Sequence, residues 1–193
     1  RIAAAQQEAR GGDHESLADV AEHEAEQQRR DQRDDRRRIG LAAAGLQPSQ
    51  IDTIIVSHFH GDHINGLRNK DGALTFPNAK ILVPAPEWAW WMDDARMNAL
   101  PENQRGNFMA VRRVFGPIAQ NVERFEPGRE LVPGIRSMPA FGHTAGHTTF
   151  MVENGGQKLL YWADTTNVAA LFVRNPDWAV MFDADAEAAR KVR

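Results

Sequence analysis

The distribution of apolar and polar residues changes abruptly near residue 39. From Glu22 to Arg38 the chain is nearly all Glu, Gln, Asp and Arg. Such a segment has too little apolar surface to offset the entropy lost on ordering, so we expect a solvated helix or disorder. We therefore divide the chain into a charged tail, residues 1–38, and a folded domain, residues 39–193. A basic docking segment is the alternative for the tail, and its histidines, His14 and His23, are not expected to bind metal.

Beyond residue 39 the pattern predicts helices and strands in mixed order. The apolar run from Ile51 to Ser57 has the length of a strand that is covered on both faces. Asn154-Gly155-Gly156 predicts a hairpin between the last two strands. Further strands are predicted at 80–83, 122–125, 135–139, 148–152 and 158–162, and helices at 39–46, 64–68, 87–99, 104–119 and from Asp183 or Asp185 to Arg193. This mixture is typical of a layered α/β fold.

Composition removes several classes of protein from consideration. Hydrophobic content of 42% and charged content of 25% are typical of soluble globular proteins. A net charge of −3 gives no reason to expect a nucleic-acid partner, and no apolar stretch approaches the roughly 20 residues that span a bilayer. Without cysteine, any metal must be held by nitrogen and oxygen. The chain opens at Arg1 without a signal-like segment, so we expect a fragment or processed product and leave the compartment open between cytoplasmic and periplasmic or secreted.

Six consecutive residues after the first predicted strand, His58-Phe59-His60-Gly61-Asp62-His63, hold four side chains that can bind metal. His and Asp are seldom fully buried without partners, so packing explains three imidazoles and a carboxylate poorly. A divalent cation would satisfy all four, and each is an ordinary ligand for zinc or another first-row metal. The segment therefore predicts a metal site.

Two later segments hold further candidates. His143 and His147 lie four residues apart in the glycine-bounded segment 142–148, where one can bind metal while the other hydrogen-bonds around the site. Asp164 directly follows the predicted strand 158–162 and is either a ligand or a helix cap.

The motifs HxHxDH and GHTxGHT, followed by an Asp after a strand, together resemble those of the metallo-β-lactamase-fold hydrolases. The likeness covers about residues 39–193, and the stretches 76–79, 131–135 and 142–150 look most like the methyl parathion hydrolase branch, a relative of the quorum-quenching lactonases. It implies an αββα sandwich with a metal site at the sheet edges. It also implies one metal on His58, His60 and His143, a second on Asp62 and His63, Asp164 bridging the two, and His147 hydrogen-bonded behind the ligands.

Such a site implies hydrolysis. Three histidines on one ion leave a coordination position open, and two ions about 3.5–4 Å apart can share and activate a hydroxide. The expected substrate is a hydrophobic ester, lactone, amide or phosphotriester, with Asp62 as a candidate proton relay to the leaving group. Zinc is the first expectation for one or two ions, and manganese, iron and cobalt suit similar donors.

Two departures from the family pattern lead us to expect an incomplete domain. The family has another His ligand beyond the bridging Asp, but no His follows His147 in this chain. The charged tail also stands where the family has its first strands. We therefore expect a second metal site that lacks one ligand, and a chain that is poorly stable or depends on a second copy, as a homodimer would provide.

The segment Glu87-Trp88-Ala89-Trp90-Trp91-Met92 holds three of the five tryptophans. Core packing is the simplest interpretation for Trp88 and Trp90. By their position relative to the family's insertion, Trp91 and Phe108 are expected to form a hydrophobic wall of the substrate pocket.

Three other functions stay open. A thioesterase like glyoxalase II is disfavoured by the aromatic segment, and a nuclease is disfavoured by the net charge. The third is a catalytically impaired chain that binds metal but turns nothing over, because one ligand of the second site is missing.

Overall fold

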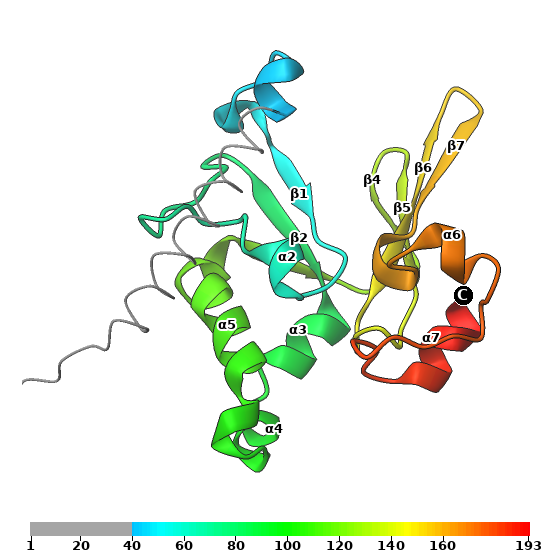
Figure 1. Ribbon diagram of the computed structural model, residues 1–193. Coiled ribbons are helices and arrows are strands. Elements are labelled where there is room, and N and C mark those ends of the chain that lie inside the picture. The colour runs from blue at the N-terminus through cyan, green and yellow to red at the C-terminus, as the bar shows by residue number, and fades with distance from the viewer. Residues whose placement is uncertain (1–39) are drawn as a thin grey trace, which may run out of the picture. The chain divides into compact units, whose positions relative to one another are not determined.

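Two β-sheets, each accompanied by its own helices, organise the chain (Figure 1). The computed structural model describes residues 40–193, of which residues 46–193 form one unit. The predicted charged tail, with His14 and His23, lies outside the described residues. We call residues 46–125 the first half of this unit and residues 130–193 the second half.

The first half contains a parallel sheet in the order β1-β2-β3. Its strands are β1 (Thr53–Ile55), β2 (Lys80–Pro84) and β3 (Val122–Phe125). The connections contain α2 (Gly61–Ile64), α3 (Ala85–Trp91), α4 (Asp94–Ala99) and α5 (Gly106–Phe115), with 3-10 turns at Pro48–Gln50, Glu102–Gln104 and Gly116–Asn121. Parallel strands need such crossovers, so helices lie against this sheet.

Strand β2 shows why the first sheet is apolar on both faces. Ile81 and Val83 pack into a cluster with residues of α3 and α5, whereas Leu82 between them packs with Phe125 and with Phe150 of the other sheet. Side chains alternate between the two faces of a strand, so a strand covered on both sides reads as a continuous apolar run. The layered α/β arrangement predicted from the sequence is confirmed.

The second half contains an antiparallel sheet in the order β4-β5-β6-β7. Its strands are β4 (Glu130–Val132), β5 (Ile135–Pro139), β6 (Thr148–Asn154) and β7 (Gln157–Tyr161). The predicted hairpin joins β6 to β7, with Gly155 and Gly156 both at positive φ. A 3-10 turn at Ala163–Thr165, helix α6 (Ala169–Phe172) and helix α7 (Ala186–Val192) follow, and both helices lie beside this sheet in Figure 1.

Several elements differ from the sequence prediction, and helix α6 was not predicted. The helix predicted at 87–99 is two helices, because Asp93 accepts a hydrogen bond from the Arg96 amide and starts α4 anew. The helix predicted at 64–68 instead occupies Gly61–Ile64, within the His-rich motif itself. Strand β4 was not predicted, since three residues give too short a period-2 pattern to detect.

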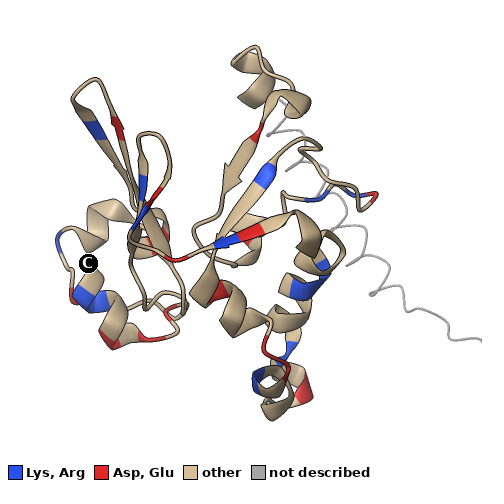
Figure 2. Cartoon of the chain, turned by 180° about the vertical axis from the view of Figure 1, so that it is seen from behind, with Lys and Arg blue, Asp and Glu red and all other residues tan. Residues whose placement is uncertain are grey.

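Charged side chains are interspersed in sign over the described residues, as Figure 2 shows for both halves. Within the same residues, no helix has both the length and the apolar character required to cross a membrane.

Candidate metal centre

The first group of candidate ligands follows β1 directly. His58 is fully buried and its Nδ1 lies 3.1 Å from the Ser57 hydroxyl. His60 is the N-cap of α2, and its carbonyl accepts hydrogen bonds from the amides of His63 and Ile64. This single helical turn brings His63 back toward His58, with ring centroids 4.1 Å apart. The HxHxDH spacing brings its histidines together because one turn of helix begins at Gly61, inside the motif.

The second group lies on the loop between β5 and β6, residues 140–147. Gly142 and Gly146 let this loop approach its neighbours closely: a Cβ at Gly142 would lie 2.2 Å from the Ala189 nitrogen of α7, and one at Gly146 would lie 2.2 Å from the Glu87 nitrogen of α3. At the end of the loop, the Thr148 amide donates to the Ser57 carbonyl over 3.1 Å. The two ligand loops are thus joined through their backbones.

Asp164 enters from the 3-10 turn after β7. The preceding residue, Ala163, has φ of +46°, in the left-handed region that L-residues other than Asn and Asp seldom occupy. The Asp164 amide donates to His147 Nε2 over 3.1 Å. The backbone around Asp164 is therefore held in one unusual conformation that turns its carboxylate toward the histidines.

Four side chains from these three segments converge on one point. Ligand atoms of His58, His60, His143 and Asp164 all lie within 4.8 Å of one another. His143 Nε2 is 3.0 Å from His60 Nδ1 and 3.4 Å from Asp164 Oδ2. His58 Nε2 is 4.0 Å from the same carboxylate oxygen. Residues separated by more than a hundred positions in the chain therefore share one small volume.

The donor set fits a divalent cation. His58 Nε2 is buried and has no hydrogen-bond partner among residues 40–193, which is costly unless something else binds it. His60 and His143 point ring nitrogens at each other, and only one of the two can carry a proton in that contact. Ligand atoms of one ion with bonds of about 2.0–2.2 Å lie no more than roughly 4.4 Å apart, and the separations of 3.0, 3.4 and 4.0 Å given above fall within this limit. Zinc and other first-row metals suit such nitrogen and oxygen donors.

The pKa shifts in the cluster follow from burial and from the carboxylates. Burial, followed by neighbouring imidazoles, lowers the pKa of His58 and His60. Hydrogen bonds from His143 and His63 hold the pKa of Asp164 well below its usual range. Burial alone would lower the pKa of His63 and His143, but their hydrogen bonds to Asp164 raise it. Protons and a cation thus compete for those two rings.

His147 lies behind the ligands. Its Nδ1 is 3.0 Å from the Ala140 carbonyl, so this nitrogen carries the proton, and Nε2 accepts from the Asp164 amide. Burial is the main reason that its pKa is lowered to about 4. Both nitrogens are therefore occupied by backbone groups, and His147 positions Asp164 instead of facing the cluster.

Asp183 supports His143 from the opposite side. Its Oδ1 accepts from His143 Nδ1 over 3.1 Å, which leaves His143 Nε2 directed at the cluster. Both Asp183 oxygens also accept from Arg193 Nη2, at 3.0 and 2.8 Å. A carboxylate behind a metal-binding histidine fixes its tautomer and raises its basicity. The sequence suggested Asp183 or Asp185 as the cap of the last helix, and Asp185 is the cap of α7, so the contact of Asp183 with His143 was not foreseen.

A second, more open group consists of Asp62, His63 and Asp164. His63 Nε2 lies 3.2 Å from Asp164 Oδ1 and 3.6 Å from Asp62 Oδ2. The Asp62 side chain is 78% exposed, so it meets solvent directly. Asp164 thus faces both groups, one with each carboxylate oxygen.

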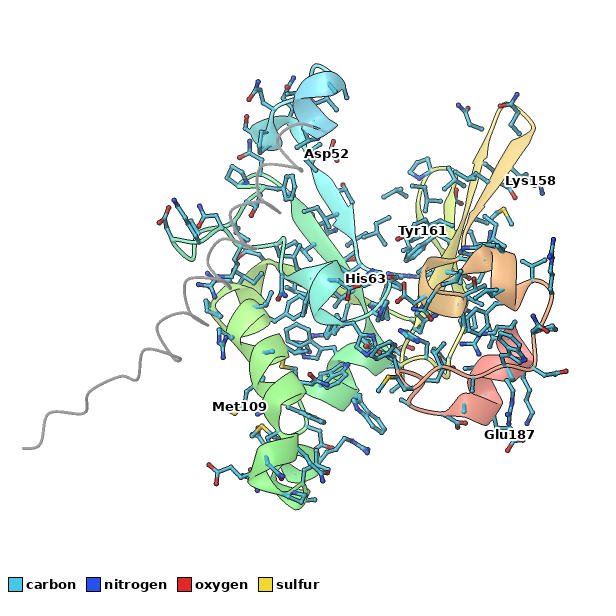
Figure 3. All side chains as sticks on the ribbon, viewed as in Figure 1. Asp52, His63, Met109, Lys158, Tyr161 and Glu187 are labelled. Carbon is cyan, nitrogen blue, oxygen red and sulfur yellow. The ribbon has the colours of Figure 1, made fainter. Side chains whose placement is uncertain are left out.

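Trp91 and Phe108 require a correction. Both are buried in the core cluster of the first half, with ring centroids 4.8 Å apart, and the Trp91 indole donates to buried Glu87. Side chains packed this way offer almost no surface to a substrate. The cleft that does reach the site has a volume of about 370 Å³ and lies between the sheets, where Figure 3 shows His63 and Tyr161. Its other lining residues are Ile54, Ile55, Val56, Ser57, Ile135, Phe150 and Val152.

Glu87 was also missed as a structural partner of the site. It is fully buried and accepts hydrogen bonds from the backbone of both ligand loops. Burial raises its pKa, opposed by hydrogen bonds from Phe59 and Trp91. The available signal in the sequence was a single acid among tryptophans in an otherwise apolar segment.

The described residues thus place a histidine and aspartate cluster beside the strands of a two-sheet α/β unit. Residues 18–193 match the family described as the metallo-beta-lactamase superfamily. The chain belongs to this superfamily.

Solved structures extend the comparison. The hydrolase AbOPH of the beta-lactamase superfamily is 28% identical with a TM-score of 0.71, and the dizinc quorum-quenching lactonase AidC, in complex with a product, is 29% identical with a TM-score of 0.71. For each, the match covers 79% of this chain and 54% of the other. A probable metal-dependent hydrolase from Staphylococcus aureus is 27% identical with a TM-score of 0.61, over 78% of this chain and 51% of the other. The chain thus spans about half the length of these structures.

Proposed function

We propose that this protein is a metal-dependent hydrolase that cleaves an ester, lactone or phosphotriester. The observation that carries the proposal is the buried His58 Nε2, which has no protein partner and lies in the cluster with His60, His143 and Asp164. A divalent cation bound there would give this buried nitrogen the partner that no described residue provides. Membership of the superfamily supports the same conclusion.

Each residue has a distinct task in this proposal. His58, His60 and His143 supply three neutral nitrogens, and Asp164 supplies negative charge to both groups of ligands. A bound divalent ion would lower the pKa of a water molecule toward neutrality and polarise the bond to be cleaved. Asp62 is exposed and its Oδ2 lies 3.6 Å from His63 Nε2, so it can take up the proton that the attacking water loses and pass it to the leaving group.

A lactone is the first substrate to test, because AidC is a lactonase. The cleft beside His63 is mainly aliphatic and aromatic, which also suits an apolar ester. Zinc is the first metal to test for the same reason, since AidC is a dizinc protein. The second group of ligands has only three side chains, so we propose tight binding of one ion per chain and weaker binding of a second.

The test combines elemental analysis with activity on a lactone, an aryl ester, an aryl phosphotriester and a thioester. We expect about one tightly bound ion per chain and metal-dependent turnover of one of the first three substrates. His60→Ala should weaken metal binding by more than about 100-fold, and His147→Ala should weaken it by about 10- to 100-fold, because His147 touches the site only through Asp164. His23→Ala is the matched control and should change neither quantity.

Four results would change the proposal. Two tightly held ions per chain would contradict the single-site stoichiometry. Turnover of the thioester alone would favour the glyoxalase II-like alternative. Metal binding without turnover of any substrate would favour the impaired metal-binding protein. Equal metal loss in His60→Ala and His147→Ala would refute the supporting role of His147.

A further inference from the structure

We propose that Glu87 is a positioning residue that locks the two ligand loops of the metal centre to each other. Its hydrogen-bond partners among the described residues are not candidate ligand side chains, and it comes from helix α3, far from either loop in sequence. The inference rests on the metal centre of the proposed function and concerns how that centre is held in shape.

The contacts of Glu87 reach both loops at once. Oε1 accepts from the Phe59 amide over 2.9 Å, and Phe59 lies between the candidate ligands His58 and His60. Oε2 accepts from the Gly146 amide over 2.7 Å, and Gly146 directly precedes His147. One carboxylate therefore fixes the backbone of the HxHxDH loop with one oxygen and that of the GHTxGH loop with the other.

The surroundings of Glu87 make this link strong and specific. The residue is 0% exposed, and Oε1 also accepts from the Trp91 indole over 2.8 Å. An ionised carboxylate can only accept, so three N–H donors match it, and charge-assisted bonds of this length are about twice as strong as neutral ones. Leaving such a group unpaired would be costly, because the site is closed to water.

Gly146 is the residue that allows the loop to come close enough to Glu87 for this link. A Cβ at position 146 would lie 2.2 Å from the Glu87 nitrogen and 2.7 Å from its Cβ, so only glycine permits the loop to approach α3 this closely. The Thr148 amide and Ser57 carbonyl join the loops at a second place. Glu87 thus adds a side-chain clamp to a backbone contact, and its removal should loosen the centre without separating the loops.

Glu87→Gln is the informative substitution, because it keeps the size and removes one acceptor. If the amide oxygen stays with Phe59 and Trp91, the new NH₂ group faces the Gly146 N–H, and two donors oppose each other. Trp91→Phe is the matched control: it removes a hydrogen bond to the same carboxylate but leaves both loop contacts in place.

The measurement is the affinity of the full chain for zinc, by competition with a chelator, and the visible spectrum of the cobalt(II)-loaded protein. Both are taken at a temperature where circular dichroism shows each variant folded. We expect Glu87→Gln to bind zinc about 10- to 100-fold more weakly and to alter the cobalt spectrum, as supporting residues of metal sites do. Trp91→Phe should lose thermal stability but keep the affinity and spectrum of the wild type.

The outcomes separate this inference from the proposed function. Wild-type affinity and spectrum in Glu87→Gln, with only thermal stability reduced, would overturn the inference while leaving the hydrolase proposal intact. A wild-type chain that binds no zinc or cobalt would overturn both. If Glu87→Gln does not fold, amide hydrogen exchange of the wild type replaces it. Zinc should then protect the Phe59 and Gly146 amides together, and protection of one alone would refute the link.

Discussion

The two halves of the folded unit are packed very differently, although each supplies part of the metal centre. The first half has a continuous core that includes Phe59, Ile81 and Phe115, with helices over its sheet. In the second half, large apolar side chains lie in solvent: Leu159 is 64% exposed and Met181 is 90% exposed. The candidate ligands His58 and His60 therefore follow a strand of the well-packed half, whereas the candidate ligand Asp164 follows the exposed strand β7.

The candidate metal centre therefore joins a well-packed half to a half with many exposed apolar side chains. Loops and termini with few buried contacts open most easily. Here such segments are joined to the first half by the ligand cluster, by the Ser57–Thr148 backbone bond and by Glu87. We expect a bound cation to stabilise mainly the half that lacks a core of its own.

The largest expected effect tests the packing difference itself. Phe108→Ala removes a buried aromatic ring from the first half and should lower the free energy of unfolding by about 3–5 kcal/mol. Leu159→Ala, on the exposed strand β7, is the matched truncation in the second half and should cost about 0.5 kcal/mol or less. Denaturant unfolding of both variants checks this. Similar losses would show that the second half is as well packed as the first.

Metal removal should act on the two halves unequally. At a free metal concentration 100 times the dissociation constant, binding stabilises the folded state by about 2.7 kcal/mol. Chelation should therefore increase amide hydrogen exchange in residues 135–193 by up to about 100-fold, and in residues 80–125 by much less. His60→Ala serves as the control, because the chelator should leave its exchange unchanged. A uniform increase across both halves would contradict a local role of the metal.

The smallest effect concerns the support of His143. Asp183→Asn removes the charge that holds both His143 and Arg193, and metal affinity should fall by about 10-fold. Asp185→Asn lies two residues away and keeps a good cap for α7, so neither affinity nor stability should change appreciably. Zinc titrations of the two variants decide the matter. An unaltered affinity in Asp183→Asn would mean that the loop alone orients His143.

Much of this could be predicted from the sequence where the cause is local. The HxHxDH motif places its ligands within one strand end and one helical turn, and strands such as Ile135–Pro139 show their pattern directly. The apolar run 80–83 predicted a strand, which extends to Pro84 in the structure. The superfamily resemblance was confirmed by the match over residues 18–193.

The rest depends on contacts between residues far apart in the chain. Glu87 meets Gly146 across 59 positions and Asp183 meets His143 across 40, and no periodicity encodes either pair. Trp91 and Phe108 were expected at a pocket wall from their position relative to the family's insertion. Their residue types could not decide between a pocket and a core, because aromatic rings are common in both. Only the packing of α3 against α5 shows that they are core.

The left-handed backbone of Ala163 affects which substitutions this position can accept. A left-handed alanine costs about 1–2 kcal/mol relative to ordinary backbone, and glycine would remove that cost. Glycine would also allow this turn many more backbone conformations, so the Asp164 carboxylate would be less well positioned to bind a cation. Relief of backbone strain therefore favours glycine at position 163, whereas a preformed binding geometry favours alanine.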